Sequence, residues 1–77
     1  MIKYLEVIDI NMIPVSSSTI AAIGYEGSTL YVEFSNGSLY EYYNVPRSLY
    51  DGLMSASSHG EYLDAYIKKG GYKYSRI

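Results

Sequence analysis

The clearest pattern in the chain is the strict alternation of apolar and polar positions over residues 29–34, which places Leu30, Val32 and Phe34 on one side. A period of two is typical of a half-buried β-strand. The Asn36-Gly37 pair that follows is a strong signal for a hairpin. The same reasoning predicts strands over 19–26, 29–34 and 38–43, with weaker strand patterns over 2–10 and 72–77.

The length of the hairpin turn decides which tyrosines face the core. A two-residue turn at Asn36-Gly37 would place Glu41 on the apolar face beside Val32, and burial of an unpaired carboxylate is costly. A three-residue turn over 35–37, with its glycine in the left-handed region, shifts the pairing by one residue and exchanges the faces. We therefore predict this bulged turn, which brings Tyr40 and Tyr42 to the core. The outward face would then carry Glu41 beside an apolar strip made of Tyr31, Leu39 and Tyr43.

The second half of the chain has helical periodicity. Pro46 suits the first turn of one helix, and Ser58-His59-Gly60-Glu61 matches a capping box that begins a second helix. Gly70-Gly71 would end that helix. The expected apolar positions are Val45, Leu49, Leu53 and Ala56 on the first helix, and Tyr62, Leu63, Tyr66 and Ile67 on the second. We expect an α+β fold, with a small antiparallel sheet of three or four strands and two helices packed on one face.

Length and composition narrow the class of protein. With 77 residues and no cysteine, the chain has a thin core and no disulfide, so we expect a homo-oligomer, a dimer or larger. Residues 1–11 would form an N-terminal extension and residues 12–77 the domain. No apolar run is long enough to span a bilayer, and Glu6 and Asp9 interrupt the N-terminal apolar stretch. These features predict a cytoplasmic protein without membrane contact.

The high tyrosine content and the uneven distribution of charge suggest that the protein binds a small anionic ligand. Eleven residues are tyrosine, and this side chain combines a flat apolar ring with a polar tip. The net charge is −2, yet residues 65–77 contain four basic side chains and no acidic one. An acidic protein is poorly suited to a long polyanion, whereas a local basic cluster suits a compact anion with one or two phosphates. Alternatively, Lys68 and Lys69 complement the dipole at the end of the second helix.

The candidate ligand-binding residues form three groups. Ser58, His59 and Gly60 begin a helix, where free backbone N–H groups favour phosphate, although simple capping explains them as well. Aromatic rings can stack on nucleobases, although core or interface packing is the alternative for most of them. Arg47 could pair with phosphate or be solvated. The remaining candidates are Tyr31, Tyr43, Tyr72 and Tyr74 for stacking, and Lys73 and Arg76 in the basic tail.

Catalysis has little support in the sequence. The chain has a single histidine, His59, without a cysteine partner or a recognisable third orienting group. It has no metal-ligand spacing and no glycine-rich phosphate loop. We therefore predict a protein that is not an enzyme, with no catalytic residues, no metal and no cofactor.

Several blocks in order resemble the KTSC domain family. They include VSSSTIAAIGYE, the Tyr40-Glu41-Tyr42 motif followed by Val45-Pro46, the Ser58-x-Gly60 loop and a terminal YKYSRI. The family takes its name from domains at the C-terminus of some lysyl-tRNA synthetases, and it also occurs as separate bacterial and phage proteins. The resemblance covers residues 12–77, and the synthetase association implies contact with RNA.

Three functions remain open from the sequence. The leading one is a binding protein that holds a small phosphate-bearing nucleotide, and small oligomeric phage proteins that sequester cyclic-nucleotide immune signals offer an analogy. The first alternative is an RNA-binding module. The second is a protein–protein adaptor that uses the outward tyrosine strip.

Overall fold

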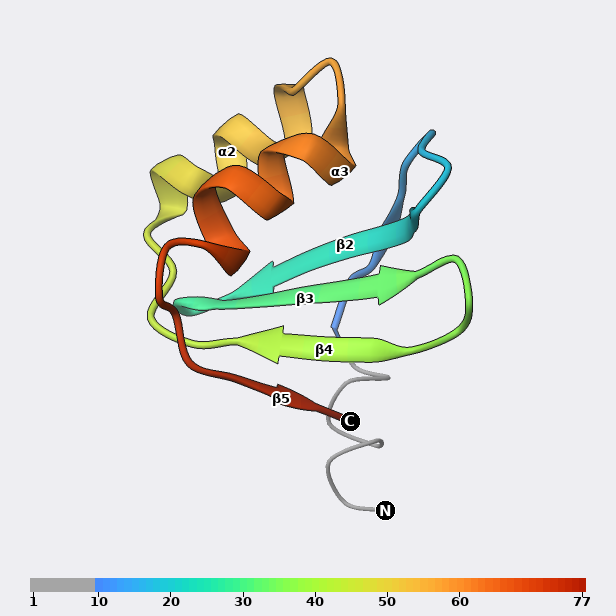
Figure 1. Cartoon of the computed structure of the whole chain (residues 1–77). Coiled ribbons are helices and arrows are strands. Elements are labelled where there is room, and N and C mark those ends of the chain that lie inside the picture. The colour runs from blue at the N-terminus through green and yellow to red at the C-terminus, as the bar shows by residue number, and fades with distance from the viewer. Residues whose placement is uncertain (1–9) are drawn as a thin grey trace.

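The computed structural model describes residues 10–77 as a five-stranded antiparallel sheet with the helices on one face (Figure 1). The strands lie side by side in chain order, and all the helices lie in the long connection between the fourth strand and the fifth. The α+β class is as expected, but the sheet has an additional strand, because Ile13–Pro14 pairs with the strand that follows it. The strand predicted over 2–10 falls almost wholly outside the described residues. The strands are β1 (Ile13–Pro14), β2 (Ile20–Glu26), β3 (Thr29–Phe34), β4 (Leu39–Tyr42) and β5 (Tyr74–Arg76).

The hairpin between β3 and β4 has the predicted register. Leu30 lies opposite Tyr42, and Val32 lies opposite Tyr40. Gly37 has a φ of 92°, in the left-handed region that glycine adopts without strain. The three-residue turn is therefore confirmed, and Tyr40 and Tyr42 face the helices as expected.

The position of Glu41 agrees with the predicted register, but its burial was not expected. It faces away from the helices beside Tyr31, as the register requires, but it is only 5% exposed. Its carboxylate accepts a hydrogen bond from the Tyr43 hydroxyl at 2.6 Å. On the same face, Gly24 lies so close to Ile10 and Met12 that a Cβ atom there would come within 3 Å of both side chains. The outward face is thus partly covered by the chain itself.

The helical layer begins after Pro46, which lies at the N-cap position of α2 (Arg47–Ser55). The second helix starts as α3 (His59–Tyr62) and widens into a π-helical segment, η1 (Leu63–Lys68). The Lys69 amide donates to the carbonyl of Asp64, five residues back. No helix among residues 10–77 is long and apolar enough to cross a membrane.

Close packing joins the two helices to each other and to the sheet. A Cβ atom on Gly52 would lie 2.7 Å from Cζ of Tyr62, so glycine allows α2 and α3 to approach. Tyr66 was expected on the apolar side of the second helix, but it is 54% exposed, because Leu63 and Ile67 alone point inward from η1. The buried cluster consists of Ile20, Ile23, Leu30, Val32, Tyr42, Val45, Leu53, Leu63 and Ile67.

Candidate ligand-binding site

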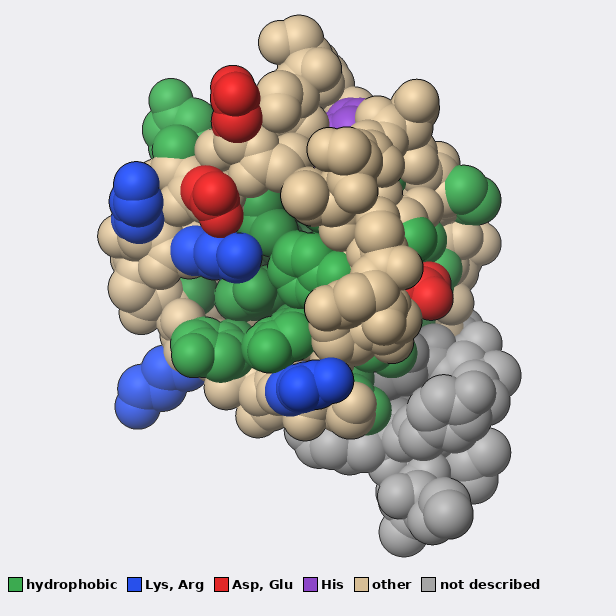
Figure 2. Space-filling view, turned by 45° about the vertical axis from the view of Figure 1, so that its right-hand side comes forward, with side chains coloured by type: hydrophobic (Ala, Val, Ile, Leu, Met, Phe, Trp, Pro, Cys, Tyr) green, Lys and Arg blue, Asp and Glu red, His purple; other side chains and the backbone are tan. Residues whose placement is uncertain are grey.

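An aromatic groove opens between the helical layer and the C-terminal half of the sheet. Its volume is about 450 Å³. Figure 2 shows hydrophobic side chains gathered below the helices on this side of the molecule, with basic side chains next to them. The aromatic groove is lined by Phe34, Asn36, Ser38, Tyr40, Tyr42, Lys68, Tyr72 and Tyr74.

The rings of the aromatic groove form one connected set. Phe34 meets Tyr40 edge to face, with ring centroids 5.5 Å apart. Tyr40 and Tyr42 lie nearly parallel at 6.2 Å, and Tyr74 is tilted against both. Tyr74 comes from β5, directly opposite Tyr42 in the sheet, and is 61% exposed. Its ring can therefore pack against a planar ligand without leaving the groove.

Lys68 contributes the positive charge of the aromatic groove. Its Nζ atom lies 5.3 Å from the centre of the Phe34 ring, where a cation is attracted to the electron-rich face. The same ammonium is 3.3 Å from Oδ1 of Asp64, one turn earlier. Both side chains are about half exposed, so the ion pair is weak and an incoming anion can compete for the lysine.

Tyr42 lies at the bottom of the aromatic groove and is only 3% exposed. Burial raises the pKa of its hydroxyl to about 12, and the nearby groups Tyr40, Tyr74 and Asp64 add to the effect. The hydroxyl therefore keeps its proton at neutral pH. The hydroxyl has no hydrogen-bond partner within residues 10–77. In the same range, every side-chain nitrogen or oxygen that is fully buried does have a partner, so this hydroxyl is not fully buried. The hydroxyl must therefore keep contact with the groove that it lines.

A second, larger cavity adjoins the aromatic groove. We call it the serine cleft, and its volume is about 760 Å³. Phe34, Asn36 and Lys68 line both cavities, so the two adjoin at these residues. The other residues of the serine cleft are Ser16–Ile20, Ser35, Ser57–Glu61, Leu63 and Asp64.

Hydrogen bonds fix the walls of the serine cleft. The Ser17 hydroxyl accepts from the amides of Thr19 and Ile20. The Ser35 hydroxyl donates to the Ser18 carbonyl, and the Ser35 amide donates to the Thr19 carbonyl at 2.8 Å. This side of the cleft is thereby attached to the sheet and does not need a ligand to order it.

The predicted helix start at Ser58, His59 and Gly60 lies in the serine cleft. The Ser58 hydroxyl accepts a hydrogen bond from the Glu61 amide, which confirms the cap. His59 donates from Nδ1 to the Leu53 carbonyl at 2.8 Å, because a carbonyl can only accept. A Cβ atom on Gly60 would lie 2.7 Å from the Thr19 hydroxyl, so packing within the chain accounts for this glycine.

The other predicted residues are distributed over the molecule. Tyr72 and Tyr74 line the aromatic groove, whereas Tyr31 and Tyr43 lie on the outward face of the sheet or its continuation. Arg76 is exposed on β5, opposite Tyr40, but lines neither cavity. Lys73 is likewise exposed and lines neither cavity, and its carbonyl accepts from the Tyr43 amide.

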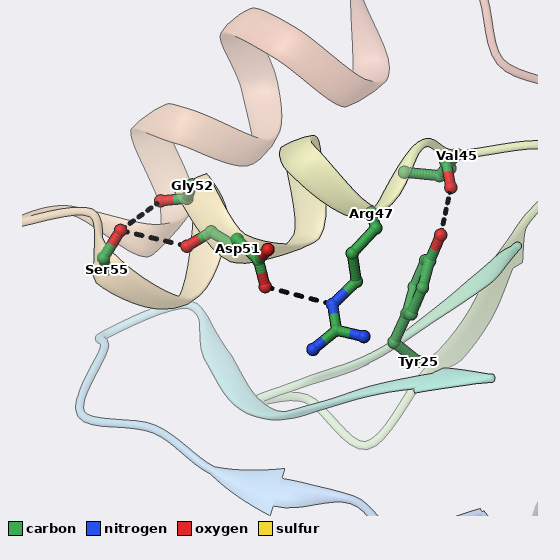
Figure 3. Close-up of polar contacts among 6 residues, drawn as sticks. All are labelled: Tyr25, Val45, Arg47, Asp51, Gly52 and Ser55. Atoms are coloured by element: carbon green, nitrogen blue, oxygen red, sulfur yellow. Dashed lines mark hydrogen bonds and ion pairs between the residues drawn. The ribbon is translucent and has the colours of Figure 1, made fainter.

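Arg47 lies in a separate cluster (Figure 3). Its Nε atom is 3.1 Å from Asp51, and its guanidinium lies 5.5 Å from the centre of the Tyr50 ring. Tyr50 stacks on Tyr25 at 4.8 Å, and the Tyr25 hydroxyl donates to the Val45 carbonyl. These contacts connect α2 to β2, and Arg47 lines neither cavity.

The sequence-based candidates omitted six residues of the aromatic groove: Phe34, Asn36, Ser38, Tyr40, Tyr42 and Lys68. The alternation along β3 and β4 placed the three rings on one face correctly, but that face was interpreted as core. Within the described part of the chain, no group of three or more His, Asp or Glu residues is placed to hold a metal ion.

Comparison with known proteins agrees with the fold and the order of motifs. The family model of the KTSC domain matches residues 16–74. A KTSC domain protein from Yersinia pestis, solved as a crystal structure, superposes with a TM-score of 0.79 at 37% identity, covering 88% of this chain and 97% of that one. A protein from Tsukamurella paurometabola is 39% identical over 74% of this chain and 88% of its own length.

The chain is also similar to part of much longer proteins. A lysine–tRNA ligase from Nostoc sp. is 38% identical over 94% of this chain, but the match spans only 13% of the ligase. The chain is therefore comparable to one small segment of such enzymes and to almost the whole of the shorter relatives. The match of the family model and the similarity to the Yersinia pestis domain show that the chain belongs to the KTSC domain family.

Proposed function

We propose that this domain is a non-catalytic binding module that holds a small nucleotide in the aromatic groove. The observation that carries the proposal is a set of rings around the Tyr42 hydroxyl, which faces the groove and has no hydrogen-bond partner within residues 10–77, with an ammonium group at the rim. A nucleotide offers the three matching features, which are a planar ring, polar atoms at the ring edge, and a phosphate.

The base would pack against the exposed ring of Tyr74, with its edge directed toward Tyr42. Stacking on an aromatic side chain contributes about 1–3 kcal/mol per base and does not depend on the identity of the base. The Tyr42 hydroxyl can donate to, or accept from, a polar atom at the base edge. A ligand that covered this hydroxyl without bonding to it would leave it unpaired at a cost in free energy, so the hydroxyl favours ligands that satisfy it.

The phosphate would bind at Lys68. This lysine is the cationic side chain that lines the aromatic groove within residues 10–77. Glu61 and Asp64 line the serine cleft, where their carboxylates oppose an anion at the start of α3. Lys68 therefore replaces the helix start as the proposed phosphate contact.

A module of this kind would act by capture, and its effect would depend on its amount relative to the ligand. Sequestration of a cyclic-nucleotide signal is one such role. Self-association belongs to the same proposal, and the half-buried strip of Tyr31, Leu39 and Tyr43 is the surface we would test for it by sedimentation.

Nucleotide binding should stabilise the fold measurably. A ligand at 100 times its dissociation constant adds about 2.7 kcal/mol to the free energy of unfolding. A thermal-shift screen with nucleoside monophosphates and cyclic dinucleotides should therefore give a clear rise in melting temperature for at least one of them. Ribose 5-phosphate, which lacks the base, is the matched control. If no nucleotide shifts the melting temperature, a protein–protein role for the aromatic groove becomes the better account.

The Tyr42→Phe variant tests whether the hydroxyl at the bottom of the aromatic groove contributes to nucleotide binding. Phenylalanine keeps the ring and removes the hydroxyl, so stability should stay within about 0.5 kcal/mol of the parent, because no internal hydrogen bond is lost. Nucleotide affinity should fall about tenfold, as expected for one hydrogen bond at a buried site. Calorimetric titration of both proteins measures the difference. Unchanged affinity would exclude a role for this hydroxyl in binding.

RNA is the second candidate ligand, because several relatives are lysine–tRNA ligases. A single-stranded segment could place one base in the same groove. Salt separates the two cases, since binding through many phosphates weakens steeply with salt, whereas binding through one phosphate weakens only slightly.

A further inference from the structure

We infer that the serine cleft is a second subsite, and that it takes an uncharged, hydroxyl-bearing group joined to the nucleotide in the aromatic groove. This inference rests on the proposed function and defines the ligand class more closely. The expected ligand is a nucleotide that carries a second sugar, such as a nucleoside diphosphate sugar or a dinucleotide.

The two cavities adjoin each other, which is the first argument for a joint ligand. Lys68 lines both, so a phosphate bound there would lie at their junction. One substituent of that phosphate would enter the aromatic groove, and the other would point into the serine cleft. A mononucleotide would fill the smaller cavity and leave the larger one to water.

The serine cleft is lined by hydroxyl and carboxylate groups that suit a sugar. The hydroxyls of Ser16, Ser18 and Ser57 line the cleft without a hydrogen-bond partner within residues 10–77. The carboxylates of Glu61 and Asp64 add acceptors. Neutral hydroxyl groups can use donors and acceptors together, and carboxylates are established partners of ribose hydroxyls.

The charged side chains that line the serine cleft favour a neutral group over an anion. Two carboxylates and one ammonium line it, and that ammonium is shared with the aromatic groove. A second anionic group would meet a net negative wall, whereas a sugar would not. The Nδ1 atom of His59 donates to the Leu53 carbonyl, which leaves Nε2 as the ring nitrogen available to a hydroxyl group.

The walls are also formed in advance. Ser17, Ser35 and Thr19 hold the 16–19 loop against the sheet and against Gly60. A site that is already ordered pays less conformational entropy on binding. A sugar in the cleft should therefore add affinity.

Matched ligand pairs test the inference. The pairs are ADP with ADP-ribose, UDP with UDP-glucose, and GDP with GDP-mannose, each measured by calorimetric titration. In the pair whose base binds best, the sugar-carrying ligand should bind about tenfold more tightly, as expected for two or so additional hydrogen bonds. Equal affinity within that pair would overturn the inference and leave the proposed function intact. No binding by any of the six ligands would overturn the inference, and the proposed function would fall as well if the thermal-shift screen also gave no hit.

A double variant, Ser18→Ala with Ser57→Ala, locates the gain. Both side chains are exposed, so the fold should be unaffected. The variant should lose most of the advantage of the sugar-carrying ligand, while its affinity for the plain diphosphate stays within twofold of the parent. Ser48→Ala, which is exposed on α2 and lines neither cavity, is the control. A double variant that retains the full advantage would place the sugar outside the serine cleft.

Discussion

Replacing Leu53 with alanine should lower the free energy of unfolding by about 3 kcal/mol. Leu53 is completely buried on α2, where it packs in the cluster that joins the helices to β2, β3 and β4. Removing its branched end leaves a void that the surrounding side chains cannot fully close. Single small domains are stabilised by about 5–15 kcal/mol in total, so this is a large share. Urea unfolding followed by circular dichroism measures the loss.

Ser48→Ala on the same helix is the matched control for Leu53→Ala. Ser48 is exposed, and its replacement should change stability by less than about 0.5 kcal/mol. If Leu53→Ala cost no more than this control, α2 would not be packed on the sheet in solution.

The largest effect on binding is expected for Lys68→Gln. Glutamine keeps most of the length of the side chain and its compatibility with a helix but removes the charge. Loss of a charge-assisted hydrogen bond to phosphate should weaken nucleotide binding about 10- to 100-fold. Titration calorimetry at low salt would give the change in affinity directly.

Lys69→Gln is the control that distinguishes a specific contact at Lys68 from the general effect of losing one positive charge. It changes the net charge by the same amount on the neighbouring residue, which is exposed and lines neither cavity. Affinity in this variant should stay within about twofold of the parent. Equal losses in the two variants would indicate a diffuse electrostatic attraction and would remove Lys68 from the proposed site.

Much of the sheet could be predicted because its signals are local. Alternation fixed the face of each residue in β3, and the cost of burying Glu41 against the helices selected the correct register. The capping box located the start of α3 for the same reason, since it needs only four consecutive residues. The two-residue strand β1 was missed, because its pairing depends on β2 and leaves no periodic pattern.

The aromatic groove could be predicted only in part. Its rings come from β3, β4 and β5 and the segment before β5, and alternation says which face they share without saying how fully the helices cover that face. The helical layer stops short of Tyr74, and this leaves a groove where a complete core was expected. The contacts of Arg47 with Asp51 and Tyr50 could not be predicted although these partners are local, because the contacts depend on side-chain rotamers.

Because η1 contains a widened turn, the number of residues in this helix decides which side chains point toward the sheet. Each residue of a regular α-helix advances the chain by about 100° around the axis. The wide turn allows Leu63 and Ile67 to remain inward while Lys68 still lies over the Phe34 ring. A relative that lacked one residue between Tyr62 and Lys68 would therefore point a different side chain at that ring.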